Sequence, residues 1–289
     1  MKIGVVGLGN MGLGIAKNLL GKGYEVYGYD IDPARGAMLA EAGGQEAAHC
    51  AALGAEVKTA VLMVFSPDNL RDVLLGEKGL METLPSGSTV VVTASVGPDI
   101  IAEVEPKLAE KGVAILDAPL MADVNDALEG TMHMIVAGGE ETVAQCRGLL
   151  EDMSQELYFV GDRAGMGQAA KMCLQTLFSL TFESAFEVIT LGKKLGLNLE
   201  EMHRLYQNCP SSSVLFHITE SNILNRVFTD TFNPLSILDK DIHLALGMAE
   251  KLSIPLPASQ GTASVFREAM RQYAQEDIWA AVKIIEAGK

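Results

Sequence analysis

Short apolar runs alternate with helical stretches along the first 160 or so residues. This alternation is typical of βαβ units, which build a parallel sheet with helices packed on it. The predicted strands cover residues 2–7, 25–30, 57–65, 89–93, 113–117, 132–137 and 156–160, with helices between them that include 11–22, 33–42, 98–111 and 141–151.

The pattern changes near residue 165. Strand-like runs stop there, and apolar residues recur with the 3.6-residue period of a helix to the end of the chain. The predicted helices of this part cover residues 167–195, 198–207, 234–252 and 257–275. We therefore expect an α/β domain over residues 1–163 and an all-helical domain over residues 164–289, joined by one unusually long interdomain helix.

A glycine-rich turn follows the first predicted strand and opens the first predicted helix. It reads Gly7-Leu8-Gly9-Asn10-Met11-Gly12, a G-x-G-x-x-G pattern. In such a turn the first glycine permits the bend, the second lets the backbone approach a pyrophosphate, and the third lets the helix pack closely on the strand. The helix N-terminus then presents amides and the positive end of its dipole to the phosphates. The sequence predicts a Rossmann dinucleotide-binding domain that contacts its cofactor through these six residues.

Asp30 ends the second predicted strand, where a dinucleotide-binding domain places the residue that binds the ribose hydroxyls. A carboxylate accepts hydrogen bonds from the two ribose hydroxyls of NAD and repels the 2′-phosphate of NADP. Ile31 and Asp32 offer no cation for that phosphate, and Arg35 lies several residues into the next predicted helix. We therefore expect NAD as the cofactor, with Asp30 and Ile31 beside its ribose.

Acidic side chains outnumber basic ones by 37 to 22, a net charge of −15 that argues against nucleic acid or an anionic membrane as partner. The most apolar long stretch, residues 172–191, contains Gln175, Glu183 and Glu187, so a buried helix is expected rather than a membrane span. The first residues lead directly into a strand, without the pattern of a signal segment.

The four cysteines lie far apart, with neither a C-x-x-C pair nor the spacing of a metal site. The five histidines are equally scattered. We therefore expect reduced thiols, a cytoplasmic location and no metal site.

Three later segments complete a set of ordered motifs with the glycine turn. They are Asp117-Ala118-Pro119, the run Gly165-Met166-Gly167-Gln168-Ala169-Ala170-Lys171, and Lys240-Asp241. With these motifs the chain resembles, over nearly its whole length, the β-hydroxyacid dehydrogenases. This family includes 3-hydroxyisobutyrate dehydrogenase, tartronate semialdehyde reductase and the threonate dehydrogenases, and its dinucleotide-binding domain is 6-phosphogluconate dehydrogenase-like. The resemblance implies the division into domains expected above.

The resemblance assigns Lys171 as the catalytic residue. Oxidising an alcohol requires a base that takes the hydroxyl proton while hydride leaves for the nicotinamide. A lysine can serve if apolar burial and a neighbouring cation lower its pKa toward ~7–8. Gln175 lies four residues further, on the same helix face, where the family places an amide that binds substrate. A solvated lysine and a purely structural glutamine are the alternative interpretations.

Other positions follow from the same resemblance. Ser95 matches a small hydroxyl residue beside the nicotinamide and the substrate, although a strand-end serine is often only a turn former. Lys240 matches a lysine that approaches the cofactor from the helical domain. Ser66 and Pro67, after the third predicted strand, are expected to line the NAD cleft.

The chain departs from the family after Asp-Ala-Pro. The family usually continues with a small residue and then Ser-Gly-Gly, which cradles the substrate carboxylate. Here Leu120 is followed by Met121, Ala122 and Asp123, so a hydroxyl is replaced by a thioether and a carboxylate is added. If this segment binds substrate, it should suit extra hydroxyls better than a simple anion. Alternatively, Asp123 faces solvent and another segment, such as residues 211–213, binds the acid.

We therefore expect an NAD-dependent dehydrogenase acting on a small hydroxy or sugar acid, with Lys171 as general acid/base. Two alternatives stay open. One is a reductase of a small aldehyde or imine, although an imine reductase would be expected to lack Lys171. The other is a catalytically silent NAD-binding protein. The apolar helical domain further suggests a homodimer or homotetramer.

Overall fold

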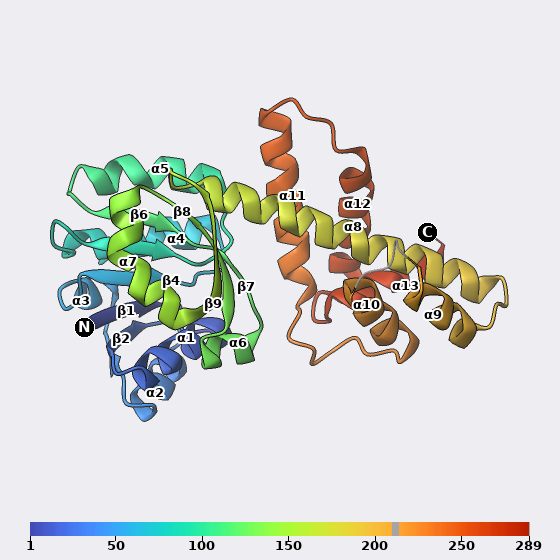
Figure 1. Cartoon of the computed structure of the whole chain (residues 1–289), viewed down its shortest axis with the longest axis horizontal. Coiled ribbons are helices and arrows are strands. Elements are labelled where there is room, and N and C mark those ends of the chain that lie inside the picture. Colours follow the sequence, from blue (N-terminus) through green and yellow to red (C-terminus); the bar gives the residue numbers. More distant parts are fainter. Residues whose placement is uncertain (210–213, 289) are drawn as a thin grey trace. The chain divides into compact units, whose positions relative to one another are not determined.

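The computed structural model describes residues 1–209 and 214–288 and divides into two compact units, Met1–Lys171 and Met172–Lys289 (Figure 1). The sequence places the boundary between residues 163 and 164, and the long helix α8 (Met166–Lys194) begins shortly after that point. The first turns of α8 pack within the first unit, so the compact units divide inside the helix.

The first unit is built around one nine-stranded sheet. Its strands are β1 (Lys2–Val6), β2 (Glu25–Tyr29), β3 (Gln45–Glu46), β4 (Thr59–Leu62), β5 (Thr89–Val92), β6 (Ala114–Asp117), β7 (Leu120–Met121), β8 (Met132–Ala137) and β9 (Ser154–Gly161). Its helices are α1 (Asn10–Gly21), α2 (Pro33–Glu41), α3 (Cys50–Gly54), α4 (Pro67–Leu75), the short 3₁₀ helix η1 (Leu80–Glu82), α5 (Pro98–Ala109), α6 (Val124–Glu129) and α7 (Glu140–Met153).

The strands follow the order β3-β2-β1-β4-β5-β6-β8-β7, with β9 paired to β8. From β3 to β6 all pairs are parallel, as the alternation of strands and helices predicts. The far edge of the sheet is mixed, because β8 runs antiparallel to β6 and to β7, while β9 pairs with β8 in parallel. Between β7 and β8 the chain forms only the six-residue helix α6 and short turns. This segment is too short for the right-handed crossover that a parallel pair would need.

Helices cover both faces of this sheet (Figure 1). Alternate residues of the central strands supply two separate cores, because neighbouring side chains on a strand point to opposite faces. Val61 and Val91 pack on the face covered by α1 and α7, whereas Leu62 and Val92 pack on the face covered by α4 and α5. All four side chains are fully buried, which fits strands that lie between two helical layers.

The second unit is helical. After α8 it contains α9 (Leu199–Gln207), α10 (Val214–Leu224), α11 (Leu235–Lys251), α12 (Pro257–Tyr273), η2 (Ile278–Ala281) and α13 (Val282–Ala287). Phe186 and Phe266 are fully buried at its centre, and their rings meet edge to face with centroids 6.5 Å apart. The rings of Phe182 and Trp279 meet in the same way with centroids 5.3 Å apart. Within the described parts of the chain, no helix is long and apolar enough to cross a membrane.

Candidate functional site

Four chain segments meet at the carboxyl edge of the parallel strands. The glycine turn follows β1, Ser66 follows β4, Ser95 follows β5, and Asp117 ends β6. The strand order reverses between β1 and β4, since the chain proceeds outward from β1 in both directions. In open α/β sheets, ligands bind at the carboxyl ends of the strands beside such a reversal.

The three glycines of the turn differ in what they make possible. Gly7 has a φ of +86°, and a Cβ there would lie 2.2 Å from the carbonyl oxygen of Met63. A Cβ on Gly12 would lie 1.8 Å from the carbonyl oxygen of Gly7. A Cβ on Gly9 would meet nothing within 4 Å. The fold therefore requires Gly7 and Gly12, whereas Gly9 leaves open space above the backbone, where a pyrophosphate would approach.

Helix α1 begins directly behind this open space. Gly9 is its N-cap, and no side chain caps the helix. The amides of the first turn and the positive end of the helix dipole are therefore available to an anion. The side chain of Leu8 is fully buried, so this residue can contact a cofactor only through its backbone.

The Asp30 carboxylate is held beside the turn by two hydrogen bonds. Its Oδ2 accepts from the backbone amide of Leu8 at 2.6 Å, and its Oδ1 accepts from the amide of Asp32 at 2.9 Å. Ile31 is 88% exposed, and Arg35 donates to Asn10 Oδ1 at 3.3 Å. The open backbone at Gly9, the uncapped helix start and the fixed carboxylate fit the phosphate and ribose groups of NAD.

Ser66 and Pro67 start helix α4. Ser66 Oγ accepts from the Asn69 amide at 3.2 Å and donates to Asn69 Oδ1 at 2.9 Å, so its hydroxyl serves as a helix cap. Pro67 occupies the first helical position, which it favours because its ring fixes a helical φ. These contacts show that Ser66 and Pro67 stabilise the start of α4. That they also line a cofactor cleft remains an expectation.

A buried carboxylate connects the end of β6 to the start of α8. Asp117 is fully buried, and it accepts hydrogen bonds from the backbone amides of Gly165 and Gln168 and from the Gln168 side chain, at 2.8 to 2.9 Å. A Cβ on Gly167 would lie 2.9 Å from the same carboxylate, so only glycine permits this approach. Burial raises the pKa of Asp117 to about 6. The hydrogen bonds to the carboxylate lower the pKa, but the effect of burial is larger.

Gln168 extends this connection to the segment after β5. Its Oε1 accepts from the amides of Val96 and Gly97 at 2.9 and 3.0 Å, and its Nε2 donates to the carbonyl of Ala94 at 2.9 Å. Ser95, which is half-buried, lies within the segment held by these bonds. The sequence motif contained Gln168, but its spacing gave no sign of these partners.

Lys171 follows Gln168 by three residues on α8, about one helical turn away. Only 6% of its surface is exposed. A lysine is rarely buried this deeply without a partner or a chemical role. The described network therefore fixes the turn of α8 that carries a buried amine.

The helical unit brings together three residues of the remaining motifs. Gln175 Nε2 donates to Asp241 Oδ2 at 2.5 Å, and Lys240 Nζ lies 3.2 Å from Asp241 Oδ1. Gln175 and Asp241 are both buried. The Gln175 amide nitrogen is thus held by Asp241, a partner that sequence reasoning missed, and its Oε1 is the atom that remains to accept a hydrogen bond from a ligand.

The structure gives Asp123 a local role. It is the exposed N-cap of α6, and its Oδ1 accepts from the amides of Asn125 and Asp126 at 2.7 and 3.0 Å. The Asp126 carboxylate accepts from the Asp123 amide in return, which completes a capping box. The Asp-x-x-Asp spacing in the sequence carried this signal.

The other two residues of the candidate substrate segment precede this cap. Met121 lies on β7 opposite His133 and is half-buried, and Ala122 packs against the core. Residues 211–213, the alternative carboxylate-binding segment, lie outside the described residues.

The histidines are less scattered in space than in sequence. His203 on α9 and His217 on α10 meet around Glu220, with one potential ligand atom of each within 4.8 Å of the others. The spacing in the sequence gave no sign of this group, because it does not show that α9 and α10 are neighbours.

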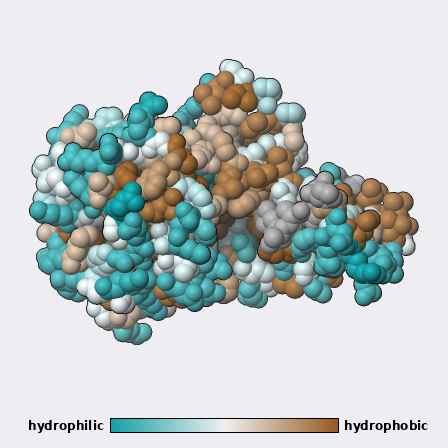
Figure 2. Space-filling view, viewed as in Figure 1, coloured by the Kyte–Doolittle hydropathy of each residue, from teal (hydrophilic) through white to brown (hydrophobic). Residues whose placement is uncertain are grey.

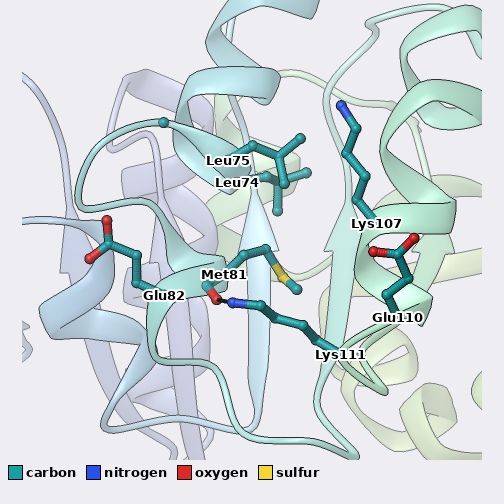
Figure 3. Close-up of a pocket in the computed structure, with 8 residues that line it drawn as sticks. Leu74, Leu75, Met81, Glu82, Lys107, Glu110 and Lys111 are labelled. Atoms are coloured by element: carbon teal, nitrogen blue, oxygen red, sulfur yellow. Dashed lines mark hydrogen bonds between the residues drawn. The ribbon is translucent and has the colours of Figure 1, made fainter.

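A surface pocket of about 290 Å³ lies elsewhere on the first unit, between the C-terminal parts of α4 and α5 and the 3₁₀ helix η1 (Figure 3). Lys111 closes one side by donating to the carbonyl of Met81. Lys107, Glu110 and Glu82 line the rim with mixed charge. The C-terminal ends of these helices belong to the edge of the sheet opposite the glycine turn, and the pocket is too small for a dinucleotide.

The glycine turn and the Asp30 carboxylate define a dinucleotide-binding site of the NAD type. Comparison with known families agrees. Residues 2–161 match the NAD-binding domain of 6-phosphogluconate dehydrogenase, and residues 165–285 match the family described as NAD-binding of NADP-dependent 3-hydroxyisobutyrate dehydrogenase. The chain belongs to the β-hydroxyacid dehydrogenase family, so the resemblance carried by the four motifs is confirmed.

Relatives with assigned names match along nearly the full length. L-threonate dehydrogenase from Haemophilus influenzae is 29% identical over 98% of this chain and 94% of its own. The enzyme of that name from Cupriavidus necator is 30% identical over 98% and 95%. The solved structure of 3-hydroxyisobutyrate dehydrogenase from Salmonella typhimurium superposes with a TM-score of 0.87 at 26% identity, covering 98% of this chain and 99% of that one.

Proposed function

We propose that the protein transfers hydride between NAD and a hydroxyl-bearing carbon of a small polyhydroxy carboxylic acid, with Lys171 as the general acid/base. The buried amine of Lys171, on a turn of α8 fixed to the carboxyl edge of the sheet, carries this proposal. NAD, when bound, accepts the hydride. The chain itself must orient the alcohol and remove its proton.

Lys171 is suited to the proton transfer because its ammonium group has been taken out of bulk water. A side chain held away from bulk water exchanges its proton with the bound substrate rather than with solvent. The proton leaves the substrate hydroxyl for Lys171 Nζ as the C–H bond breaks, and in reduction the same atom returns it.

Positioning supports the assignment of Ser95 and Gln175 to substrate binding. The Gln168 contacts hold the segment around Ser95 in place. The hydrogen bond to Asp241 fixes the orientation of the Gln175 side-chain amide. Its Oε1 is therefore positioned to accept a hydrogen bond from a substrate hydroxyl. Two fixed polar groups cost less entropy on binding than two mobile ones.

NAD rather than NADP is supported by the environment of Asp30. Both carboxylate oxygens accept backbone hydrogen bonds, so the negative charge is fixed where a 2′-phosphate would lie. Arg35 is the cation nearest in sequence, and it is engaged with Asn10. Lys240, Ser66 and Pro67 are assigned to the cofactor only through the family motifs.

A sugar acid is the substrate class that the chain supports best. The curated relatives quoted above are L-threonate dehydrogenases. Met121 and Ala122 replace the hydroxyl and the first glycine of the Ser-Gly-Gly segment that suits small hydroxyacids. A four-carbon acid with several hydroxyls compensates for the lost anion contact with hydrogen bonds elsewhere.

The test is NADH formation with a panel of acids, which includes L-threonate, its stereoisomers and 3-hydroxyisobutyrate. We expect kcat/KM to be highest for a polyhydroxy acid and to fall to background in the Lys171→Met variant. The proposal would be overturned if this variant kept more than about a tenth of the wild-type turnover, or if no hydroxy acid in the panel exceeded the variant's rate.

We further propose a homodimer or homotetramer in the cytoplasm. Apolar surface gathers over parts of the helical unit (Figure 2), and Leu191 and Leu195 of α8 are 60% and 65% exposed. Exposed apolar area of this kind is commonly covered by another subunit. The described cysteines are free thiols, which suits a reducing compartment. Sedimentation equilibrium of the wild type and of a Leu191→Glu/Leu195→Glu variant tests the assembly, and a monomeric wild type would exclude it.

A further inference from the structure

His203, His217 and Glu220 form a compact group in the helical unit, on helices α9 and α10. His203 Nδ1 contacts Glu220 Oε2 directly, and His217 Nδ1 lies 3.9 Å from the same oxygen. The two imidazole rings meet edge to face with centroids 5.9 Å apart. None of the motifs that bind cofactor or substrate involves these residues.

The burial of the three groups is unequal in a useful way. The Glu220 side chain is only 2% exposed, whereas those of His203 and His217 are 33% and 30% exposed. A carboxylate therefore lies at the bottom of the group, with two imidazoles above it that solvent can reach. A solute can approach the group from the side of the histidines.

Charge makes this arrangement incomplete. A buried carboxylate is costly unless it is paired with a cation. Neutral imidazoles donate hydrogen bonds but bring no charge. A cation that binds all three groups together would compensate the charge of Glu220.

The donor set matches a divalent transition metal. Histidine nitrogens and glutamate oxygens are ligands that zinc accepts in proteins, with bonds of ~2.0–2.2 Å, and a water would fill the fourth position here. The ligand atoms of such an ion lie roughly 3–3.5 Å apart. The three atoms here lie within 4.8 Å of one another, so small side-chain rotations would bring them to an ion.

Gln207 supplies the support that a metal-binding histidine usually has. Its amide lies 2.9 Å from His203 Nε2, the ring nitrogen that faces away from Glu220. A ligating histidine typically donates this second N–H to a neighbouring oxygen, and rotation of the Gln207 amide presents one. His203 Nδ1 would then be the metal ligand.

Helix α9 contacts its neighbours through half-buried side chains, such as Tyr206, whose ring meets that of Phe216 with centroids 5.1 Å apart. None of its residues, Leu199 to Gln207, is buried. Helices in proteins depend mainly on tertiary packing, and nine residues are too few for a stable isolated helix. An ion shared by His203 of α9 and the two ligands of α10 would join the helices.

We propose that His203, His217 and Glu220 form a structural site for one divalent transition ion, with Zn²⁺ as the best-fitting metal, that joins α9 to α10. The bound ion compensates the Glu220 charge and replaces the direct contact between His203 and Glu220. It takes no part in the hydride transfer.

The full chain, treated with chelator and then titrated with Zn²⁺ against a chromophoric competitor, tests the site. We expect about one Zn²⁺ per chain with micromolar or tighter binding, and an increase in Tm with added metal. His203→Gln and Glu220→Gln should each weaken binding at least ~10- to 100-fold, the loss already typical of changes outside the ligand set.

His243→Gln is the matched control. His243 also lies in the helical unit beside a carboxylate, with its Nδ1 3.5 Å from Asp239 Oδ1, but among the described residues it belongs to no group of three such ligands. Zinc affinity should stay within about twofold of wild type.

A measurement on the wild-type chain removes any dependence on how the variants fold. The X-ray absorption spectrum of the zinc-bound protein should contain two imidazoles and an oxygen ligand. Any of three results would overturn the proposal. They are a lack of stoichiometric zinc binding below ~100 μM, a zinc affinity that is unchanged in both His203→Gln and Glu220→Gln, and sulfur in the coordination shell of the zinc.

Discussion

Asp117 accepts two hydrogen bonds from Gln168, one from its backbone amide and one from its side chain, each of 2.8 Å. The two residues are 51 positions apart and connect β6, which ends the parallel run that begins at β3, to the helix of the candidate base. Because Gln168 also holds the backbone around Ser95, the positions of Ser95 and Lys171 are set by one side chain.

Replacing Gln168 should therefore affect both stability and turnover. Gln168→Ala leaves the amides of Val96 and Gly97 and the carbonyl of Ala94 without their partner. Each such buried group costs about 1–3 kcal/mol, part of which water can recover, so we expect a loss of about 2–4 kcal/mol in the free energy of unfolding. Urea titration measures this.

Turnover should fall at least ~10-fold in the same variant, because a small misplacement of reacting groups is costly. NAD affinity should change little. Gln145→Ala, at an exposed position of α7, is the control for the loss of a glutamine. An unchanged unfolding midpoint would contradict the role given to Gln168.

Lys171→Met should lower kcat by ~10²–10⁴, since the loss of general acid/base help typically has that size. NAD affinity, measured by calorimetry, should stay nearly unchanged, because the amine acts on the substrate hydroxyl. Lys193→Met on the same helix, where the side chain is 54% exposed, should retain wild-type turnover. If Lys171→Met kept more than about a tenth of the activity, another base would have to be sought.

NAD should bind at least ~10-fold more tightly than NADP, a difference of about 1.4 kcal/mol. The reason is electrostatic, since the fixed Asp30 carboxylate repels a 2′-phosphate. The double variant Asp30→Ala/Ile31→Arg should reverse the preference, and Ile31→Ala serves as a control for the loss of the exposed side chain. Calorimetry with both cofactors decides the matter, and equal affinities in the wild type would refute the assignment.

Glu183 makes the helical unit sensitive to pH. Burial, with the neighbouring charge of Glu187, raises its pKa from 4.5 to about 7, and its Oε2 has no hydrogen-bond partner among the described residues. The folded state thus holds the proton more tightly than the unfolded state. The resulting stabilisation is fully present below about pH 4.5 and is lost as the pH rises through about 7.

Glu183→Gln should remove this dependence. Relative to the variant, the wild type should lose up to about 3 kcal/mol of unfolding free energy between pH 4 and pH 9. Asp117, whose pKa is also raised, titrates in both proteins, so the difference between them isolates Glu183. Parallel pH dependence of the two urea midpoints would show that Glu183 is solvated.

The segment at 121–123 can be tested by restoring the family's residues. Met121→Ser/Ala122→Gly keeps the Asp123 cap, and the triple variant with Asp123→Gly removes it. We expect kcat/KM to rise on 3-hydroxyisobutyrate and to fall on polyhydroxy acids, by about 10-fold or more for a charge-assisted hydrogen bond.

The triple variant should in addition lose about 0.5–2 kcal/mol of stability, because the cap of α6 is gone. This cost separates the structural effect of Asp123 from any effect on specificity. Unchanged kinetics on both substrate types would mean that the segment does not contact substrate.

The hydrophobic pattern predicted the long elements well. Helix α8 was expected at residues 167–195 and lies at Met166–Lys194. Its apolar stripe repeats over many turns, so the period is clear. The pattern could not indicate β7 and α6, of two and six residues, or the direction of β8. A strand has the same two-residue period in parallel and antiparallel pairs.

The candidate site was predictable where its parts are contiguous. The glycine turn and Asp30 belong to one βαβ unit, and their spacing has a geometric meaning. Partners that meet only through the fold left no local signal, such as Gln175 and Asp241, or His203 and His217. The family motifs pointed to Gln175 without showing what holds its side chain.

The unequal roles of the three turn glycines affect how this chain could diverge. A side chain at Gly7 or Gly12 would clash with a backbone carbonyl oxygen and distort the turn. The Cβ of an alanine at position 9 would have no protein atom within 4 Å. A descendant that no longer needed a dinucleotide would be free to change Gly9 first while it kept the same fold. Among distant homologues, a turn that retains the outer glycines without the middle one would therefore mark lineages that kept the scaffold after losing the redox chemistry.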